Sequence, residues 1–367
     1  MPTTKRRSEA IWIEKKAYWQ IKVQKDGVRK TFTSPSPGRK GKHEAENKAD
    51  DWLEKGTEDM RFDKAWGIYM NNVRKTTGTA NAANKDSIGR MWLLPKLGNR
   101  RLSAITQHNM QSCIDDAACA GKSKRLCVNI RAALTSFCHF ARTCRWEMEQ
   151  PFDLSIPRNA PTKSRAILQP SDLQLLFSCD TVTRYGKESQ AFFIHAWRFI
   201  VILGLRRGEL CGLMHSDLEN NILHINRSFN NLGEETPGKN ENARRYIALP
   251  TIAQKILHDQ HEMQKQRGII SPWIFPDESG ERLDSNHLYK AWAAYRKCHG
   301  IEASLHELRH TFVSVVKSDM PIALLKSMVG HSTSMDTFGV YGHELEGDLQ
   351  QTANIVDNVF SRLIDLK

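Results

Sequence analysis

Hydrophobic and polar residues alternate in short runs near the start of the chain. Three runs have the period of two that is typical of strands: residues 11–13, 18–23 and 28–33. Asp26-Gly27, between the last two runs, is a strong hairpin signal. Apolar residues then recur at helical spacing from residue 44 to residue 54. The pattern predicts a three-stranded sheet and one helix, which together form a domain of residues 1–57.

From residue 58 to residue 150 the apolar spacing is helical throughout. Four segments carry it: residues 62–73, 81–93, 106–118 and 123–140. Pro95 and Gly98 interrupt the pattern and predict a break in the middle. The region is therefore expected to be a helical bundle.

A proline-rich stretch, residues 151–165, has the composition of a linker. Beyond it, Pro170 is expected to begin a helix. The pattern also predicts a buried helix at residues 191–204 and two strands at residues 222–228 and 245–249. Residues 166–367 are thus expected to mix helices with a small sheet, and the whole chain to be mainly α with small β parts.

Length and composition narrow the class of protein. At 367 residues the chain is long for one core and suggests two or three domains. The longest apolar run, residues 199–205, is well short of the ~20 residues that a membrane span needs, so we expect a cytoplasmic protein. The eight cysteines show no CxxC pair and no Cys/His ligand spacing. Reduced thiols are therefore expected, and no disulfide framework or metal site is indicated.

The net charge of +12 is concentrated near the N-terminus, where residues 1–42 contain twelve basic and three acidic residues. The same stretch carries four aromatic residues: Trp12, Tyr18, Trp19 and Phe32. A basic excess together with aromatic side chains in one small unit favours a nucleic-acid-binding surface. The alternative is a packing sheet with a basic rim.

Residues suited to phosphodiester chemistry occur in the second half of the chain. They are Arg206 before Arg207-Gly208-Glu209-Leu210, His306 and Arg309 in one short motif, His331 after Gly330, and Tyr341. Two guanidinium groups could clamp a phosphate without a metal, because each stays protonated and offers a planar fork of donors. A tyrosine hydroxyl could attack phosphorus and form a covalent intermediate. Each residue alone has an ordinary structural explanation; His306, for example, could be a core histidine on an apolar helix.

The order and spacing of these motifs resemble the tyrosine recombinase (phage integrase) family. The shared pattern is Gly-x-Arg-x-Gly-Glu-Leu, His-x-x-Arg-His-Thr, Leu/Val-Gly-His-Ser, and a tyrosine ten residues after that histidine. The resemblance implies catalytic roles for Arg206, His306, Arg309, His331 and Tyr341. It also implies that Glu209 supports the arginines, whereas His310 and His343 are expected to shape the site.

The family also uses a lysine on a β-hairpin between the two arginine motifs, as the general acid for the leaving 5′-hydroxyl. Lys239 is the only lysine between Phe229 and Pro250, so the resemblance gives it this role. Family members often have Lys-Thr here, whereas this chain has Lys239-Asn240. No cofactor and no metal are implied.

The resemblance implies three domains: an arm-type DNA-binding domain at residues 1–57, a helical core-binding domain at 58–150 and, after the linker, a mixed α+β catalytic domain at 166–367. DNA contacts are expected from two groups of residues. The first is the exposed face of the sheet, with Trp19, Lys22, Arg29 and Lys30. The second is the loop with Lys122, Lys124 and Arg125, whose backbone amides would also suit phosphate oxygens.

The implied function is that of an integrase, a site-specific recombinase that integrates and excises a phage or mobile element through a 3′-phosphotyrosyl intermediate. The implied partners are double-stranded DNA with core and arm attachment sites, further copies of the chain in a homotetramer, an excisionase and a host DNA-bending protein. An apolar stripe in the tail, residues 355–364, packs either on its own domain or on a neighbouring copy.

Two other classes of protein use related parts. A DNA-binding regulator without chemistry could use residues 317–329 in a helix-turn-helix, but binding alone does not require the full set of motifs. A strand-swivelling topoisomerase would share several residues, but the N-terminal domain argues for site recognition. A chromosome-dimer resolvase is disfavoured because such enzymes normally lack that domain.

Overall fold

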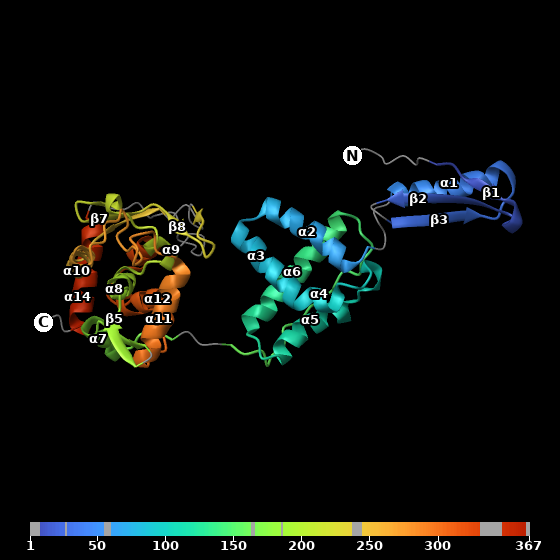
Figure 1. The fold of residues 1–367 in the computed structure, drawn as a ribbon. Helices are drawn as coiled ribbons and strands as arrows, with labels where there is room; N and C mark the ends of the chain where they lie inside the picture. Colours follow the sequence, from blue (N-terminus) through green and yellow to red (C-terminus); the bar gives the residue numbers. More distant parts are fainter. Residues whose placement is uncertain are drawn as a thin grey trace. The chain divides into compact units, whose positions relative to one another are not determined.

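The computed structural model describes residues 8–25, 28–54, 60–162, 166–184, 186–236, 244–330 and 347–364. The chain divides into two compact units, residues 1–163 and 164–367, and each is considered by itself (Figure 1). Helices dominate and the sheets are small, so the predicted fold class is confirmed. In the described part of the chain no helix is long and apolar enough to cross a membrane.

The three predicted N-terminal strands are present. Their order in one antiparallel sheet is β1 (Ile11–Ile13), β2 (Tyr18–Lys25) and β3 (Val28–Ser34), with a 3-10 turn at Glu14–Lys16. Helix α1 (Gly38–Glu54) covers one face of this sheet, as Figure 1 shows, and buries Ile21 and Val23 together with its own apolar side. The hairpin turn Asp26-Gly27 lies outside the described residues.

Helix α1 begins at Gly38, six residues earlier than the apolar spacing predicts. Its first turn is polar, so periodicity cannot detect it. Gly41 explains how this turn lies so close to the sheet: a Cβ there would be 1.7 Å from the Ser36 carbonyl oxygen and 2.8 Å from the Trp19 ring. The early start of the helix therefore depends on a residue without a side chain.

The second hydrophobic core lies within a helical bundle. Its elements are α2 (Phe62–Thr76), α3 (Thr79–Ile88), a π-helical turn (Gly89–Leu93), α4 (Leu94–Leu97), a 3-10 turn (Leu102–Ala104), α5 (Gln107–Cys119) and α6 (Lys124–Thr143). Aromatic rings fill its centre, where Phe62, Trp66, Tyr69 and Phe137 have centroids 4.8 to 5.8 Å apart. The predicted helical bundle is therefore present.

The break predicted at Pro95 does not occur, because helical structure continues from Thr79 to Leu97. The π-helical turn ends just before α4, and Pro95 occupies the first turn of that helix. A proline is tolerated there because its missing N–H needs no helical partner. The chain breaks only after Leu97, beside Gly98.

Residues 151–162, predicted as part of a linker, lie along the bundle. Gln107 accepts from the backbone N–H of Phe152 at 2.8 Å and donates to the Asp153 carbonyl at 2.8 Å. Leu154 and Ala160 are buried in the bundle's core. Prolines prevent regular structure here. The Gln107 side chain instead provides hydrogen bonds for backbone groups of the segment, and the buried side chains of Leu154 and Ala160 hold it on the bundle.

The unit of residues 164–367 is built mainly of helices and also contains small sheets. Its helices are α7 (Pro170–Ser178), α8 (Ile194–Leu203), α9 (Arg207–Leu210), α10 (Thr251–Gln266), α11 (Ser285–His299), α12 (Leu305–Val316), α13 (Ile322–Val329) and α14 (Asp348–Leu363), with a 3-10 turn at His215–Asp217. Its strands are β4 (Thr181–Arg184), β5 (Lys187–Gln190), β6 (Leu218–Glu219), β7 (Ile222–Ile225), β8 (Ser228–Phe229), β9 (Glu235–Thr236) and β10 (Arg245–Ala248).

Every residue of α8 is buried, as predicted, including His195 and Arg198, and α10 and α12 pack against it. The sheet has the order β10-β7-β6. The hairpins β4–β5 and β8–β9 are additional to the predicted strands. The sequence of β4 and β5 is mostly polar and exposed, so it carries no alternating pattern from which a strand could be predicted.

The apolar stripe of the tail lies on helix α14, which packs on its own unit. Val356, Val359 and Phe360 are buried in the hydrophobic core of the 164–367 unit. The Phe360 ring stacks on that of Phe312, with centroids 6.5 Å apart. Asp357 accepts from the first two backbone N–H groups of α10, at 2.7 and 3.0 Å. Of the two arrangements left open by the sequence, this structure has packing on the same chain.

Candidate active site

Arg206 lies in the short turn between α8 and α9. Helix α8 ends at Gly204, whose φ of 64° is left-handed, and a Cβ at this position would be 2.4 Å from the Phe312 ring. Arg206 is the N-cap residue of α9: its backbone N–H donates to Glu209 Oε2 at 2.9 Å and its Nη1 to Glu209 Oε1 at 2.6 Å. The side chain of Arg206 is 33% exposed, so the turn presents a guanidinium to solvent.

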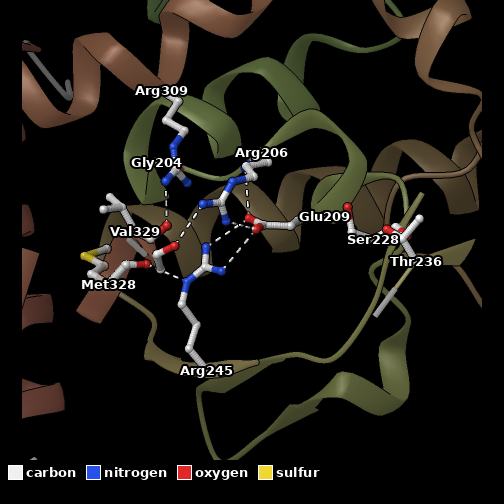
Figure 2. Close-up of polar contacts among 10 residues, drawn as sticks. Gly204, Arg206, Glu209, Ser228, Thr236, Arg245, Arg309, Met328 and Val329 are labelled. Atoms are coloured by element: carbon white, nitrogen blue, oxygen red, sulfur yellow. Dashed lines mark hydrogen bonds and ion pairs between the residues drawn. The ribbon is translucent and has the colours of Figure 1, made fainter. Parts of the chain in front are cut away.

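Glu209 is almost fully buried and binds two arginines (Figure 2). Besides Arg206, it accepts from Arg245, which donates Nη2 to Oε2 at 2.9 Å and Nη1 to Oε1 at 3.2 Å. Burial by itself would raise the pKa of Glu209, but the charges of Arg245 and Arg206 outweigh it and hold the pKa below its usual value. The carboxylate therefore stays ionised at neutral pH. The expected support of Arg206 by Glu209 has a direct geometric basis.

Arg309 lies on α12 and is 4% exposed. Its Nη1 donates to the carbonyl oxygen of Gly204 at 2.7 Å and its Nη2 to that of Val329 at 2.5 Å. Burial, and to a lesser degree the nearby charge of Arg206, lowers the pKa of Arg309 to about 9, so it remains a cation at neutral pH. Glu209 does not pair with Arg309 in the structure; its second partner is Arg245, which the sequence analysis did not select.

The three arginines converge on the C-terminal end of α13, as Figure 2 shows. Gly330, with a φ of 65°, caps this helix, and the last carbonyls of a helix lack partners within it. Each of three consecutive carbonyls accepts from a different arginine: Met328 from Arg245 Nε at 2.6 Å, Val329 from Arg309 Nη2 at 2.5 Å and Gly330 from Arg206 Nη2 at 2.8 Å. The arginines thereby fix the chain immediately before the position of His331.

His306 is exposed near the N-terminal end of α12, one turn before Arg309. The buried stripe of this helix consists of other residues: Leu305, Leu308, Phe312 and Val316. The alternative that His306 is a core histidine is therefore wrong. Its ring meets that of His310 edge to face, with centroids 5.0 Å apart.

Lys239, His331 and Tyr341 lie outside the described residues, as does His343. The described chain approaches Lys239 through β9, where the Thr236 hydroxyl donates to the Ser228 carbonyl at 3.0 Å. It resumes at Arg244, directly before Arg245. The structure thus brings together Arg206, Glu209 and Arg309 among the predicted residues, adds Arg245, and places His306 on the same helix as Arg309.

The four predicted contacts of the N-terminal sheet do not share one face. Lys22 lies between the buried positions Ile21 and Val23, so it points away from α1, and Arg29 pairs with Gln24 on that outer face. Trp19 packs with the apolar core under α1, and Lys30 lies opposite Val23, with its Nζ 5.9 Å from the centre of the Trp52 ring. Successive strand residues alternate between faces, so Trp19 and Lys30 do not lie on the outer face with Lys22 and Arg29. Lys30 is nevertheless exposed, and the DNA contacts themselves stay a prediction.

Lys122, Lys124 and Arg125 are all exposed at the start of α6. Ser123 caps this helix by accepting from the Leu126 N–H at 3.3 Å. The backbone N–H of Lys122 donates to Ala117 and that of Lys124 to Pro161, at 3.0 and 2.8 Å. These two amides are therefore occupied, and the expectation that they serve phosphate oxygens is wrong for them; the three side chains remain available.

Among the described residues, the cysteines and the metal-ligating side chains form no second candidate functional site. All eight cysteines are free, and four of them, Cys113, Cys127, Cys138 and Cys211, are buried. Burial raises the pKa of the Cys113, Cys138 and Cys211 thiols to about 12, so these groups are not reactive thiolates. No group of three or more metal-ligating side chains is found among the described residues.

Residues 172–347 match the family model described as "Phage integrase family". The chain therefore contains a phage integrase domain at these residues. This segment contains the Arg206 and Arg309 motifs, and the resemblance inferred from the sequence is confirmed.

Curated relatives agree with this assignment. An integrase of Streptomyces ambofaciens is 29% identical over 136 residues, which cover 34% of this chain and 35% of that protein. The chain spans only 50% and 56% of two tyrosine recombinases, from Caldanaerobacter subterraneus and Pyrococcus furiosus.

Two solved structures share the fold at low identity. The Tn1549 transposon integrase in complex with transposon right end DNA has a TM-score of 0.63 at 17% identity and covers 80% of this chain and 99% of its own. A lambda integrase dimer bound to a COC′ core site has a TM-score of 0.59 at 16% identity and covers 95% and 97%. These likenesses concern the fold alone.

Proposed function

We propose that the protein is an integrase: a site-specific recombinase that cleaves and rejoins DNA through a 3′-phosphotyrosyl intermediate. The observation that carries the proposal is the arrangement of Arg206 and Arg309. Both guanidinium groups are held by backbone or carboxylate acceptors, and both bind the end of α13, just before His331.

The charge of this cluster suits a phosphodiester. Arg206, Arg245 and Arg309 bring three positive charges and Glu209 one negative charge, which leaves two positive charges. Arg206 is one third exposed while its neighbours are buried, so it is the arginine best placed to meet a substrate. Preorganised cations in a partly dehydrated site stabilise the charge that develops on the non-bridging oxygens without reorganising first.

The proposed reaction cleaves and rejoins one DNA strand at a time. The Tyr341 hydroxyl loses its proton and attacks phosphorus, a bond forms between its oxygen and the 3′-phosphate, and the bond to the 5′-oxygen breaks. Lys239 supplies the proton that the leaving 5′-oxygen takes up, while Arg206, Arg309, His306 and His331 hold the phosphate. The 5′-hydroxyl of a partner duplex then attacks the adduct and releases the tyrosine. Two such rounds exchange both pairs of strands without ATP.

The other parts of the chain are assigned to DNA recognition. We assign arm-site binding to residues 1–57, core-site binding to residues 58–150 and chemistry to residues 166–367, with residues 151–165 between them. The exposed side chains of Lys22, Arg29, Lys122, Lys124 and Arg125 are the proposed phosphate contacts. A homotetramer on double-stranded DNA is the working assembly, with an excisionase and a host DNA-bending protein as further partners.

The test is a covalent-adduct assay on nicked duplexes spanning the joint that forms when the element carrying this gene excises. Purified wild type and Tyr341→Phe are incubated with the duplexes, and denaturing gels detect protein joined to DNA. Tyr289→Phe is the matched control, since Tyr289 is an exposed tyrosine on α11. We expect an adduct from wild type and Tyr289→Phe and none from Tyr341→Phe, with equal band shifts in native gels.

Other outcomes would overturn the proposal. Specific binding by all three proteins without any adduct would indicate a DNA-binding regulator. An adduct on any sequence, with relaxation of a supercoiled plasmid that lacks the joint, would indicate a topoisomerase instead.

A further inference from the structure

We propose that Arg245 is a positioning residue for recombination, which shares the charge of Glu209 so that Arg206 attracts the scissile phosphate more strongly, and which holds the end of α13 in place. The inference rests on the proposed function, because it concerns the same site. Arg245 is neither in the two arginine motifs nor among the residues assigned from the family resemblance.

Arg245 is buried and shares a carboxylate with Arg206, so we assign it a role through that carboxylate. Its side chain is 4% exposed, whereas that of Arg206 is 33% exposed. Both bind the same carboxylate, Glu209, which is 3% exposed. Glu209 therefore links Arg245 to Arg206, the more exposed of the two arginines.

The charge balance around Glu209 depends on Arg245. The carboxylate accepts from Arg206 at 2.6 and 2.9 Å and from Arg245 at 2.9 and 3.2 Å. With both arginines present, one negative charge is shared between two positive charges. Without Arg245, Glu209 would neutralise Arg206 alone, and the attraction of Arg206 for a phosphate would fall.

A second contact of Arg245 reaches the region of His331. Its Nε donates to the Met328 carbonyl at 2.6 Å, beside the carbonyls that bind Arg309 and Arg206. Arg245 is also the first residue of β10, which pairs with β7 and follows the segment that contains Lys239. One buried side chain thus ties the start of β10, α9 and the end of α13 together.

The experiment compares the rate of adduct formation by the full chain carrying Arg245→Met with that of wild type, on the nicked duplexes described above. We expect a rate roughly 10- to 100-fold lower, with the affinity in band shifts changed less than about threefold, because the loss concerns preorganised charge. Arg227→Met is the matched control. Arg227 pairs with the buried Asp217 at 2.6 Å and, among the described residues, forms no hydrogen bond or ion pair with Arg206, Glu209 or Arg309.

Two further measurements separate this role from simple loss of structure. On a duplex with a neutral methylphosphonate at the scissile position, the rate ratio of wild type to Arg245→Met should move toward one, since the charge that Arg206 must meet is smaller. The double variant Glu209→Gln/Arg245→Met should react faster than Arg245→Met, because removing the carboxylate frees Arg206 from neutralisation. If Arg245→Met does not fold, Arg245→Lys allows the same comparison. Lysine keeps the positive charge but cannot form the bidentate contact with Glu209.

The outcomes are distinct for the two proposals. No adduct from wild type overturns the proposed function, and this inference with it. Wild-type rates from Arg245→Met, equal rate ratios on charged and neutral substrates, or a double variant no faster than Arg245→Met would each overturn the positioning role alone.

Discussion

Replacement of Glu209 by glutamine tests the electrostatic account of the site most directly. The substitution conserves shape but removes the negative charge that Arg206 and Arg245 both contact. An amide offers one acceptor oxygen and adds N–H donors, which would face the donors of Arg206 and Arg245. Arg245, at 4% exposure, would keep its charge without its carboxylate partner.

The expected loss is large for one substitution. Removing one member of a buried ion pair costs about 3 to 5 kcal/mol, since it leaves an uncompensated buried charge. Arg206 is one third exposed and can recover part of its loss through water, so the cost arises mainly at Arg245. We therefore expect Glu209→Gln to lower the free energy of unfolding of the 164–367 unit by about 3 kcal/mol at pH 7.

The same argument predicts how the difference depends on pH. The folded-state pKa of Glu209 is lowered from the usual 4.5. A lowered pKa contributes stability that is fully present above the unfolded value and is lost as the pH falls through the folded one. The stability gap between wild type and Glu209→Gln should therefore be constant from pH 6 to 8, within that window, and shrink once the pH falls below about 4.5.

The assay is urea unfolding of the full chain, followed by hydrogen exchange in peptides from residues 194–210. Two compact units need not unfold together, and these peptides report on the unit that contains Glu209. Equal unfolding free energies at pH 7, or a gap that widens on acidification, would refute the reasoning.

Two further predictions concern packing and recognition. A Cβ at Gly208 would lie 2.3 Å from the Phe229 carbonyl oxygen, so Gly208→Ala should displace α9 and slow adduct formation roughly tenfold. Gly78→Ala is the control, because a Cβ at Gly78 would meet open space, and it should not slow the reaction. Equal rates for the two variants would contradict this prediction. Lys22→Ala and Arg29→Ala should each weaken binding to arm-site DNA and reduce the slope of log affinity against log salt by about 0.9, measured by fluorescence anisotropy; an unchanged slope would exclude a phosphate contact.

The sequence predicted the elements that have a strong apolar period and the residues that belong to spaced motifs. Helix α8 is an example, because its sequence is apolar apart from His195 and Arg198. Arg206 and Arg309 stand out in the sequence because they lie in spaced motifs that resemble the tyrosine recombinase family. Hairpin β4–β5 and the first turn of α1 were missed, since both are polar and owe their structure to neighbours that periodicity does not include.

Two signals in the sequence could have been used further. Arg245, Ile247 and Leu249 alternate with Tyr246, which is 52% exposed, so the strand pattern itself puts an arginine at an inward position. An inward arginine requires a buried acceptor, and Glu209 is that acceptor. Side chains alternate between the two faces along β2, so Trp19 and Lys22, three residues apart, likewise lie on opposite faces.

The convergence of three arginines on α13 joins the stability of this unit to its proposed chemistry. The unpaired carbonyls at the end of a helix carry partial negative charge, so they hold guanidinium groups in place before any phosphate arrives. These contacts link Gly204, Glu209, Arg245, Arg309 and the end of α13, segments that meet only when the unit is folded. The arginines are therefore in place before substrate binds. Charges that are already fixed lower a reaction barrier most, because they need not reorganise during the reaction. It follows that substitutions which loosen the end of α13 should reduce catalysis even where they leave every phosphate-binding side chain unchanged.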